Sequence, residues 1–186
     1  MLCERCKPIN NGCCTRNLIK NEVPIMSVEA VKEFFKQHGM EDRVKEFETS
    51  SATVELAAQA VGVIPARIAK TLSFRQKNGS GFLIVTSGDA KIDNTKYKNF
   101  FGFKATMLTP DEVLDLTGHA VGGVCPFGIN ERIPVWLDVS LLRFKTVFPA
   151  CGSGNSAIEL DCDSLYTLSG ARQWINVCKD WDPALS

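Results

Sequence analysis

The sequence predicts an α+β fold: a single domain in which short helices flank a curved mixed β-sheet. The chain has 186 residues, of which 45% are hydrophobic and 23% are charged, as in one globular domain with a substantial core. Short strand patterns mix with short helix patterns, and the regular alternation of a parallel β-α-β sheet is missing. The sequence contains no internal repeat and no low-complexity segment.

The composition changes at Met26, where the first helical pattern is about to begin. Residues 1–25 show no helical or strand periodicity, so we expect a poorly ordered leader or extension there. We expect the domain to span 26–180 and a short tail to follow at 181–186.

The cysteines of this leader raise the hypothesis of a structural zinc site, which needs four ligands. An adjacent pair and a short span fit tetrahedral coordination poorly, and we expect no metal site. The four residues are Cys3, Cys6, Cys13 and Cys14.

The first expected helices carry recognisable end signals. Residues 27–39 begin at Ser27, a good N-cap, and end at Gly39, which suits the left-handed position after a helix. A second capped pattern with a terminal glycine predicts a helix over 53–62. Pro65 suits the first turn of a short helix.

The central elements follow in the same way. Strand patterns at 68–74 and 81–87 flank the turn KNGS and predict a β-hairpin. Asp93 is expected to cap a helix over 94–101, and 104–108 is expected to form a short strand.

The last third begins with a capping box at Thr109, with Pro110 in the first helical position, and this helix is expected to end at Gly118. Beyond it, the patterns predict a series of strands and one more helix. The expected strands are 133–142, 145–150, 156–160 and 174–177, and the expected helix is 163–170.

Charge and hydropathy exclude several classes of protein. Lys plus Arg and Asp plus Glu number 21 each, whereas a protein that binds long nucleic acid is usually basic, so we expect no DNA binding and only a small contact with any RNA. No apolar run could span a bilayer, and the N-terminus lacks the apolar core of a secretory signal. We expect a cytoplasmic protein with reduced thiols and no membrane contact.

Histidine is scarce, which limits the possible chemistry. His38 lies in the last turn of the first expected helix, where a surface role is the simplest interpretation. His119 lies beside the glycine-rich stretch GHAVGGVCPFG, which also contains Cys125. One hypothesis is therefore a cysteine hydrolase in which Cys125 is the nucleophile and His119 its base.

Other features suggest chemistry without a histidine relay. Lys70 lies in the apolar strand pattern RIAKTLSF, where it either faces solvent or stabilises an anion at the mouth of a pocket. Glycine loops at 122–126 and 151–155 allow backbone N–H groups to approach a ligand closely, or they simply connect secondary-structure elements. Pro126 restricts Cys125 to extended geometry.

The motifs occur in an order and spacing that resembles the YbaK/ProX family of aminoacyl-tRNA deacylases, which are stand-alone relatives of the editing domain of prolyl-tRNA synthetase. The resemblance covers roughly residues 27–180. The motifs are IAKTL at 68–72, TGHAVGGVCPFG at 117–128, IPVWLD at 133–138 and GSGNSAIEL at 152–160.

This resemblance implies hydrolysis, without a cofactor, of the ester that joins a small wrong amino acid (Ala, Cys, Ser or Thr) to a tRNA, here tRNA(Pro). The partners it implies are the acceptor end of the mischarged tRNA and, for delivery, prolyl-tRNA synthetase or an elongation factor. A binding module for a nucleotide or a tRNA end, without catalysis, is the alternative.

Two sets of site residues follow from the resemblance. Thr53 matches a family threonine, although the histidine often found just before it is absent here. The expected catalytic residues are Lys70, Gly122, Gly123 and Val124, with the Gly123 and Val124 amides on the ester carbonyl. The expected substrate-binding residues are Thr53, His119, Cys125, Pro126, Gly152, Ser153 and Gly154.

Overall fold

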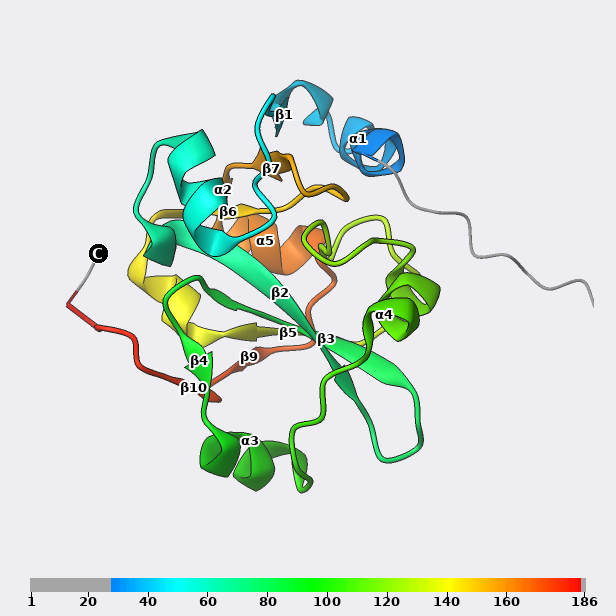
Figure 1. The fold of residues 1–186 in the computed structure, drawn as a ribbon, viewed down its shortest axis with the longest axis vertical. Coiled ribbons are helices and arrows are strands. Elements are labelled where there is room, and N and C mark those ends of the chain that lie inside the picture. Colours follow the sequence, from blue (N-terminus) through cyan, green and yellow to red (C-terminus); the bar gives the residue numbers. More distant parts are fainter. Residues whose placement is uncertain (1–27, 185–186) are drawn as a thin grey trace, which may run out of the picture.

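The computed structural model describes residues 28–184 (Figure 1). The leader at 1–25, with its four cysteines, lies outside the described residues, as does Ser27. Within 28–184, the structure is the expected α+β domain with a curved mixed sheet. Its α-helices are α1 (Val28–Lys36), α2 (Val54–Val61), α3 (Asn94–Phe101), α4 (Pro110–Thr117) and α5 (Cys162–Leu168), and its 3-10 helices are η1 (Glu41–Arg43), η2 (Pro65–Arg67) and η3 (Val139–Arg143).

The ends of α2 and α4 are formed by the residues that the sequence indicated. The side chain of Thr53 accepts a hydrogen bond from Leu56 N at the start of α2, and Thr109 and Glu112 form the complete capping box of α4. Gly118, with a φ of 73°, ends α4 in the left-handed conformation, which costs a glycine little.

The central sheet has the strand order β8-β6-β2-β3-β5-β9, and β2 and β3 form its antiparallel hairpin. Two smaller pairs, β1 with β7 and β4 with β10, lie outside it. The strands are β1 (Val44–Glu46), β2 (Ile68–Arg75), β3 (Gly81–Ser87), β4 (Lys91–Ile92), β5 (Val135–Asp138), β6 (Thr146–Pro149), β7 (Ser156–Ile158), β8 (Leu160–Asp161), β9 (Trp174–Ile175) and β10 (Cys178–Lys179).

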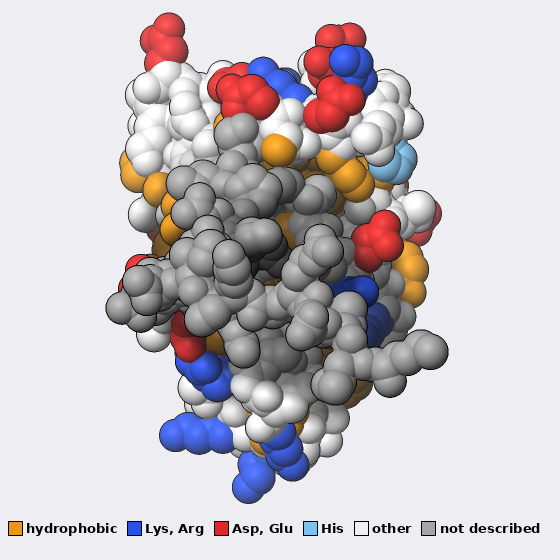
Figure 2. All heavy atoms as spheres, turned by 90° about the vertical axis from the view of Figure 1, so that its right-hand side faces the viewer, with side chains coloured by type: hydrophobic (Ala, Val, Ile, Leu, Met, Phe, Trp, Pro, Cys, Tyr) orange, Lys and Arg blue, Asp and Glu red, His pale blue; other side chains and the backbone are white. Residues whose placement is uncertain are grey.

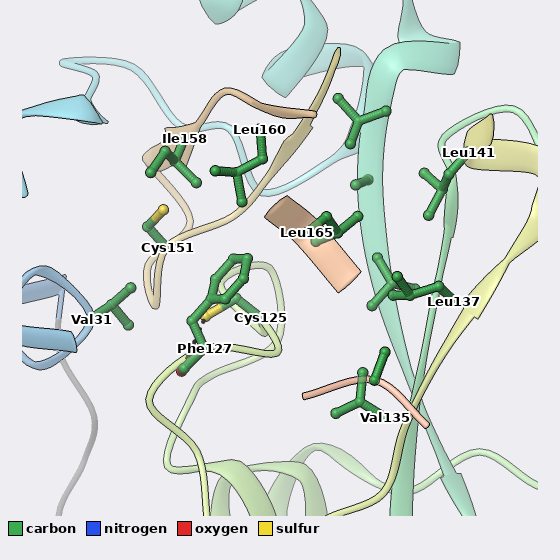
Figure 3. Close-up of a cluster of buried hydrophobic side chains, with 14 of the residues drawn as sticks. Val31, Cys125, Phe127, Val135, Leu137, Leu141, Cys151, Ile158, Leu160 and Leu165 are labelled. Carbon is green, nitrogen blue, oxygen red and sulfur yellow. Dashed lines mark hydrogen bonds between the residues drawn. The ribbon is translucent and has the colours of Figure 1, made fainter. Parts of the chain in front are cut away.

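Both faces of the central sheet are covered. One face packs against α5, whose Leu165 is fully buried near Leu137 of β5, and α1 joins the same core through Val31, beside Phe127 and Cys151 (Figure 3). The other face packs against α3 through Tyr97, which lies in a cluster of aromatic rings. Each large apolar side chain buried in this way contributes about 1.5–3 kcal/mol to folding.

Four expected strands differ from the structure, and one of them, 174–177, is only Trp174–Ile175. Residues 104–108 are not a strand, because only Met107 forms an isolated β-bridge, with Phe74 of β2. The expected strand 133–142 is shorter, since the Asp138 side chain accepts from Ser140 N and starts η3. The expected strand 156–160 breaks at Glu159, because β7 pairs with β1 whereas β8 pairs with β6.

Candidate active site

A cavity of about 440 Å³ lies along β2, where this strand faces the glycine-rich loop after α4. Most of its wall is apolar, and hydroxyl groups and one lysine are set into it. The lining residues are Ser51, Ala52, Thr53, Val54, Ala57, Ile68, Ala69, Lys70, Thr71, Leu72, Ser73, Met107, Leu108, Pro110, Val113, Val121, Gly122, Val124, Phe148, Ala150, Ser156 and Ala157.

Lys70 is the charged residue of this wall. Its Nζ donates hydrogen bonds to the carbonyl oxygens of Gly88 (2.9 Å) and Ala90 (2.5 Å), in the turn that follows β3. Burial lowers the pKa of Lys70, and the negative charges of Asp89 and Glu55 oppose this effect in part. An ammonium has three N–H donors, so one donor remains for a ligand.

A partly buried ion pair holds the turn that binds Lys70. Arg143 Nη1 and Nη2 donate to the Asp89 carboxylate, at 3.1 and 2.6 Å, and Nη2 also donates to Ser87 Oγ at 2.7 Å. The Arg143 side chain is only 4% exposed. The Asp89 side chain is 26% exposed, so the pair is partly buried. Such a bidentate pair fixes geometry better than a surface pair does, so the carbonyls of Gly88 and Ala90 are held in place.

The glycine loop fits tightly against two other loops. A Cβ on Gly123 would lie 2.6 Å from Ser153 Cα, and a Cβ on Gly122 would lie 2.9 Å from Ala52 Cβ. Gly154 also packs on Ala52, at a looser 3.3 Å. The loops around residues 52, 122 and 153 therefore interlock through positions that only glycine fits without movement.

The backbone amides of this loop differ in what they bind. The Gly123 N–H donates to Ala120 O at 3.0 Å, inside a turn. The amides of Gly122 and Val124 have no hydrogen-bond acceptor in the described part of the chain, and both residues line the cavity. These two amides are therefore available to a ligand, whereas that of Gly123 is already used.

His119 and Cys125 form a buried pair behind the cavity wall. The Cys125 N–H donates to His119 Nδ1 at 3.5 Å, and Sγ lies 3.8 Å from the same nitrogen. Both side chains are fully buried, and Cys125 lies among hydrophobic residues (Figure 3). Burial raises the pKa of Cys125 to about 12 and lowers that of His119 to about 4. A neutral, buried thiol outside the cavity does not support the cysteine-hydrolase hypothesis.

The expected site residues divide into two groups. Those at the cavity surface are Thr53, Lys70, Gly122 and Val124. The others lie behind the wall or away from it, and Pro126 faces a separate cavity between α1 and the end of α5. The residues outside the cavity lining are His119, Gly123, Cys125, Pro126, Gly152, Ser153 and Gly154.

Several polar residues of the wall were missed by sequence reasoning. Thr71 and Ser73 follow Lys70 along β2, and Ser51 and Ser156 come from the neighbouring loop and strand. The adjacency of Thr71 to Lys70 was not a signal, because successive side chains of a strand point to opposite faces of the sheet. The two serines carry no signal either, since hydroxyl residues are common in loops.

Charged side chains are unevenly distributed on the face drawn in Figure 2, although the charges of the chain sum to zero. Asp and Glu lie mainly toward the upper end, together with some Lys and Arg, and the lower end shows Lys and Arg. The lower end in Figure 1 contains α3 and the β2–β3 turn.

Among residues 28–184, no helix is long and apolar enough to cross a membrane, and no cluster of three His, Cys, Asp or Glu side chains could hold a metal ion.

A family model and several known proteins that resemble this chain point to the same family. The model of the aminoacyl-tRNA editing domain matches residues 48–168. The uncharacterised protein YwhH of Bacillus subtilis is 59% identical over its entire length, which corresponds to 84% of this chain. A proline–tRNA ligase of Pelobacter propionicus is 28% identical over 50% of this chain, and the match takes in 17% of that ligase.

A solved structure supports the same relationship. The crystal structure of a candidate trans-editing enzyme for prolyl-tRNA synthetase is 33% identical and superposes with a TM-score of 0.74. The match covers 82% of this chain and 96% of that protein. The likeness thus includes nearly all of the described domain.

Proposed function

The chain belongs to the aminoacyl-tRNA editing domain family, and from this premise we propose that it is a trans-acting deacylase. It hydrolyses the ester of a mischarged tRNA that carries a small amino acid. The observation that carries the proposal is the convergence, at one cavity, of a partly desolvated lysine and two backbone N–H groups that have no acceptor among residues 28–184. Neither a metal nor a cofactor is needed for this reaction.

The unpaired amides stabilise the charge that develops during the reaction. Water adds to the ester carbonyl, and the oxygen of the tetrahedral intermediate accepts hydrogen bonds from the amides of Gly122 and Val124. The intermediate then collapses and expels the 3′ oxygen of the tRNA. Removing one such donor from an enzyme typically costs about 10²–10³-fold in rate, so two backbone donors supply much of the catalysis.

Lys70 supplies the positive charge of the site. Its remaining N–H donor contacts the terminal phosphate or the ester oxygen, and the apolar surroundings strengthen this interaction. The proton of the attacking water goes to a group of the substrate, either a ribose hydroxyl or the α-amino group. His119 does not take this proton, because it is buried behind the wall.

The dimensions of the cavity restrict the amino acid. Val113, Leu108 and Phe148 narrow a space of about 440 Å³ that also receives the terminal adenosine. An editing site of this kind accepts Ala, Cys, Ser or Thr, small residues that a synthetase pocket rejects by only about 1–3 kcal/mol per missing methylene, and it excludes the bulkier cognate residue. The likeness to proline–tRNA ligases favours tRNA(Pro) as the carrier.

A deacylation screen tests the proposal. The protein is incubated with tRNA(Pro) and tRNA(Ala) charged with Ala, Ser, Thr, Cys or Pro, and the loss of aminoacyl-tRNA is measured over time. We expect release of at least one small residue and retention of Pro on its own tRNA. Binding of a charged tRNA without turnover of any of them would instead support a non-catalytic binding module.

A further inference from the structure

β2 is paired along only part of its outer edge. β6 pairs with β2 as far as Ala69. Further along, the Leu108 N–H donates to the Ser73 carbonyl at 3.1 Å, so pairing resumes there. Between these points, Thr71 has no strand neighbour on this side among the described residues. The outer edge of β2 is therefore unpaired over the three residues 70–72, and this gap opens on the cavity.

The backbone groups of Thr71 face this gap. Within a strand, the N–H and C=O of one residue point to the same edge, and those of the next residue point to the other edge. The Ser73 carbonyl and the Arg75 N–H, which donates to Thr106 O at 2.8 Å, both face the outer edge. Thr71 is two residues from Ser73, so its N–H and C=O face outward as well.

The side chain of Thr71 is also unsatisfied. Its Oγ1 is buried and has no hydrogen-bond partner in the described part of the chain. A buried hydroxyl without a partner costs about 1–3 kcal/mol, and most such groups in proteins are paired. Thr71 therefore presents two donors (N–H and O–H) and two acceptors (C=O and Oγ1) to the cavity, and no group among residues 28–184 uses them.

An aminoacyl group has the complementary arrangement, because its α-ammonium and ester carbonyl have the spacing of one strand residue. On the basis of the proposed function, we propose that Thr71 binds the aminoacyl residue of the substrate as a strand residue would be bound. Its C=O and Oγ1 accept hydrogen bonds from the α-ammonium, and its N–H donates to the ester carbonyl. This is strand addition reduced to one residue.

The proposal requires a free α-ammonium in the substrate. Alanyl-tRNA(Pro) is compared with lactyl-tRNA(Pro), in which a hydroxyl replaces the ammonium, and each rate is divided by the spontaneous hydrolysis rate of that ester. We expect wild-type protein to favour the alanyl ester by at least about tenfold in kcat/KM, because a charge-assisted hydrogen bond is the stronger one.

Variants at Thr71 connect this preference to the residue. Thr71→Val keeps the shape and removes Oγ1, and we expect it to lower kcat/KM about tenfold for the alanyl ester and far less for the lactyl ester. Thr71→Ser keeps the hydroxyl and should restore the preference. An equal loss on both esters, or wild-type protein without preference, would overturn the inference.

A separate measurement covers failure of the proposed function itself. If wild-type protein hydrolyses neither ester, the deacylase proposal is wrong. Binding of 3′-(alanylamino)-3′-deoxyadenosine, a stable amide, is then measured by NMR titration of wild-type protein and the two variants. Weaker binding by Thr71→Val, together with recovery in Thr71→Ser, supports the ammonium contact; equal binding by all three proteins refutes it.

Discussion

The two walls of the cavity are held in place by different physics. The β2 wall is electrostatic: the Lys70 ammonium is bound by carbonyls of a turn that the Asp89–Arg143 pair fixes. The loop wall is steric and neutral, since Gly122 and Gly123 pack on neighbouring loops at distances that exclude a Cβ. The charge of the site is thus placed on a regular strand, whereas its backbone donors come from an irregular loop whose close packing requires glycine.

Removal of the charge from the β2 wall should cause the greatest loss of activity. Lys70→Ala removes the charge of the site, and we expect kcat/KM for deacylation to fall by about 10³-fold, since this charged donor is worth at least as much as a neutral one. Lys91→Ala is the matched control, because its side chain is 73% exposed, forms an ion pair with Asp180 and does not line the cavity. Deacylation by Lys70→Ala within a few-fold of wild type would refute the role of this lysine.

A smaller loss of activity should follow when a Cβ is added to the tightly packed loop wall. Gly123→Ala places a Cβ 2.6 Å from the backbone of Ser153, so the two loops must separate. We expect a loss of about 10²-fold in kcat/KM, the cost of displacing one backbone donor, and a loss of about 1–3 kcal/mol in stability. Gly154→Ala is the milder control, because the nearest atom to its Cβ would be Ala52 Cβ at 3.3 Å, with the Ala52 and Gly122 backbones at 3.7 and 4.0 Å. Equal activities of the two variants would contradict the interlocking of the loops.

A third effect is on stability and depends on pH. Burial lowers the pKa of His119 from 6.5 to about 4, so the unfolded chain binds a proton more readily than the folded chain does. The contribution of neutral His119 to the free energy of unfolding is therefore fully present above pH 6.5. This contribution decreases by about 3 kcal/mol as the pH falls toward 4.

Urea unfolding at several pH values measures this decrease. In His119→Asn the part of the decrease between pH 6.5 and 4 should disappear, whereas exposed His38→Asn should retain it. The same slope in all three proteins would show that His119 does not titrate as its burial implies.

Removal of the Cys125 thiol should change activity least, because the loop acts through its backbone amides. Cys125→Ala should leave turnover within about twofold of wild type, because the thiol lies outside the cavity, and should cost about 1 kcal/mol in stability for the lost packing. Initial rates and iodoacetamide treatment check this result. Inactivation of wild-type protein by alkylation, together with loss of turnover in Cys125→Ala, would revive the cysteine-hydrolase hypothesis.

Much of the fold was predictable from local signals. The caps at Thr53, Asp93 and Thr109 and the β2–β3 hairpin are determined by residues within a few positions of one another, and all of them were found. The strands β1, β4 and β10 were missed because two or three residues are too short for a periodic pattern. Their partners are distant in sequence, as for Val44 opposite Ile158.

The site was predictable only in part for the same reason. The lysine motif and the glycine loop indicated which segments matter, and Lys70, Gly122 and Val124 do meet at one cavity. Other features depend on contacts between distant segments. The Gly123–Ser153 approach and the carbonyls that bind Lys70 are of this kind, and no local pattern encodes them.

The gap in β2 also bears on solubility. An exposed strand edge normally invites pairing with another chain, and long open edges promote aggregation. Here the unpaired stretch is limited by β6 on one side and by the 106–108 segment on the other, so an incoming strand has no room for a second pair of hydrogen bonds. The protein can thus offer strand-like hydrogen bonds to a small molecule without exposing a template for intermolecular sheets.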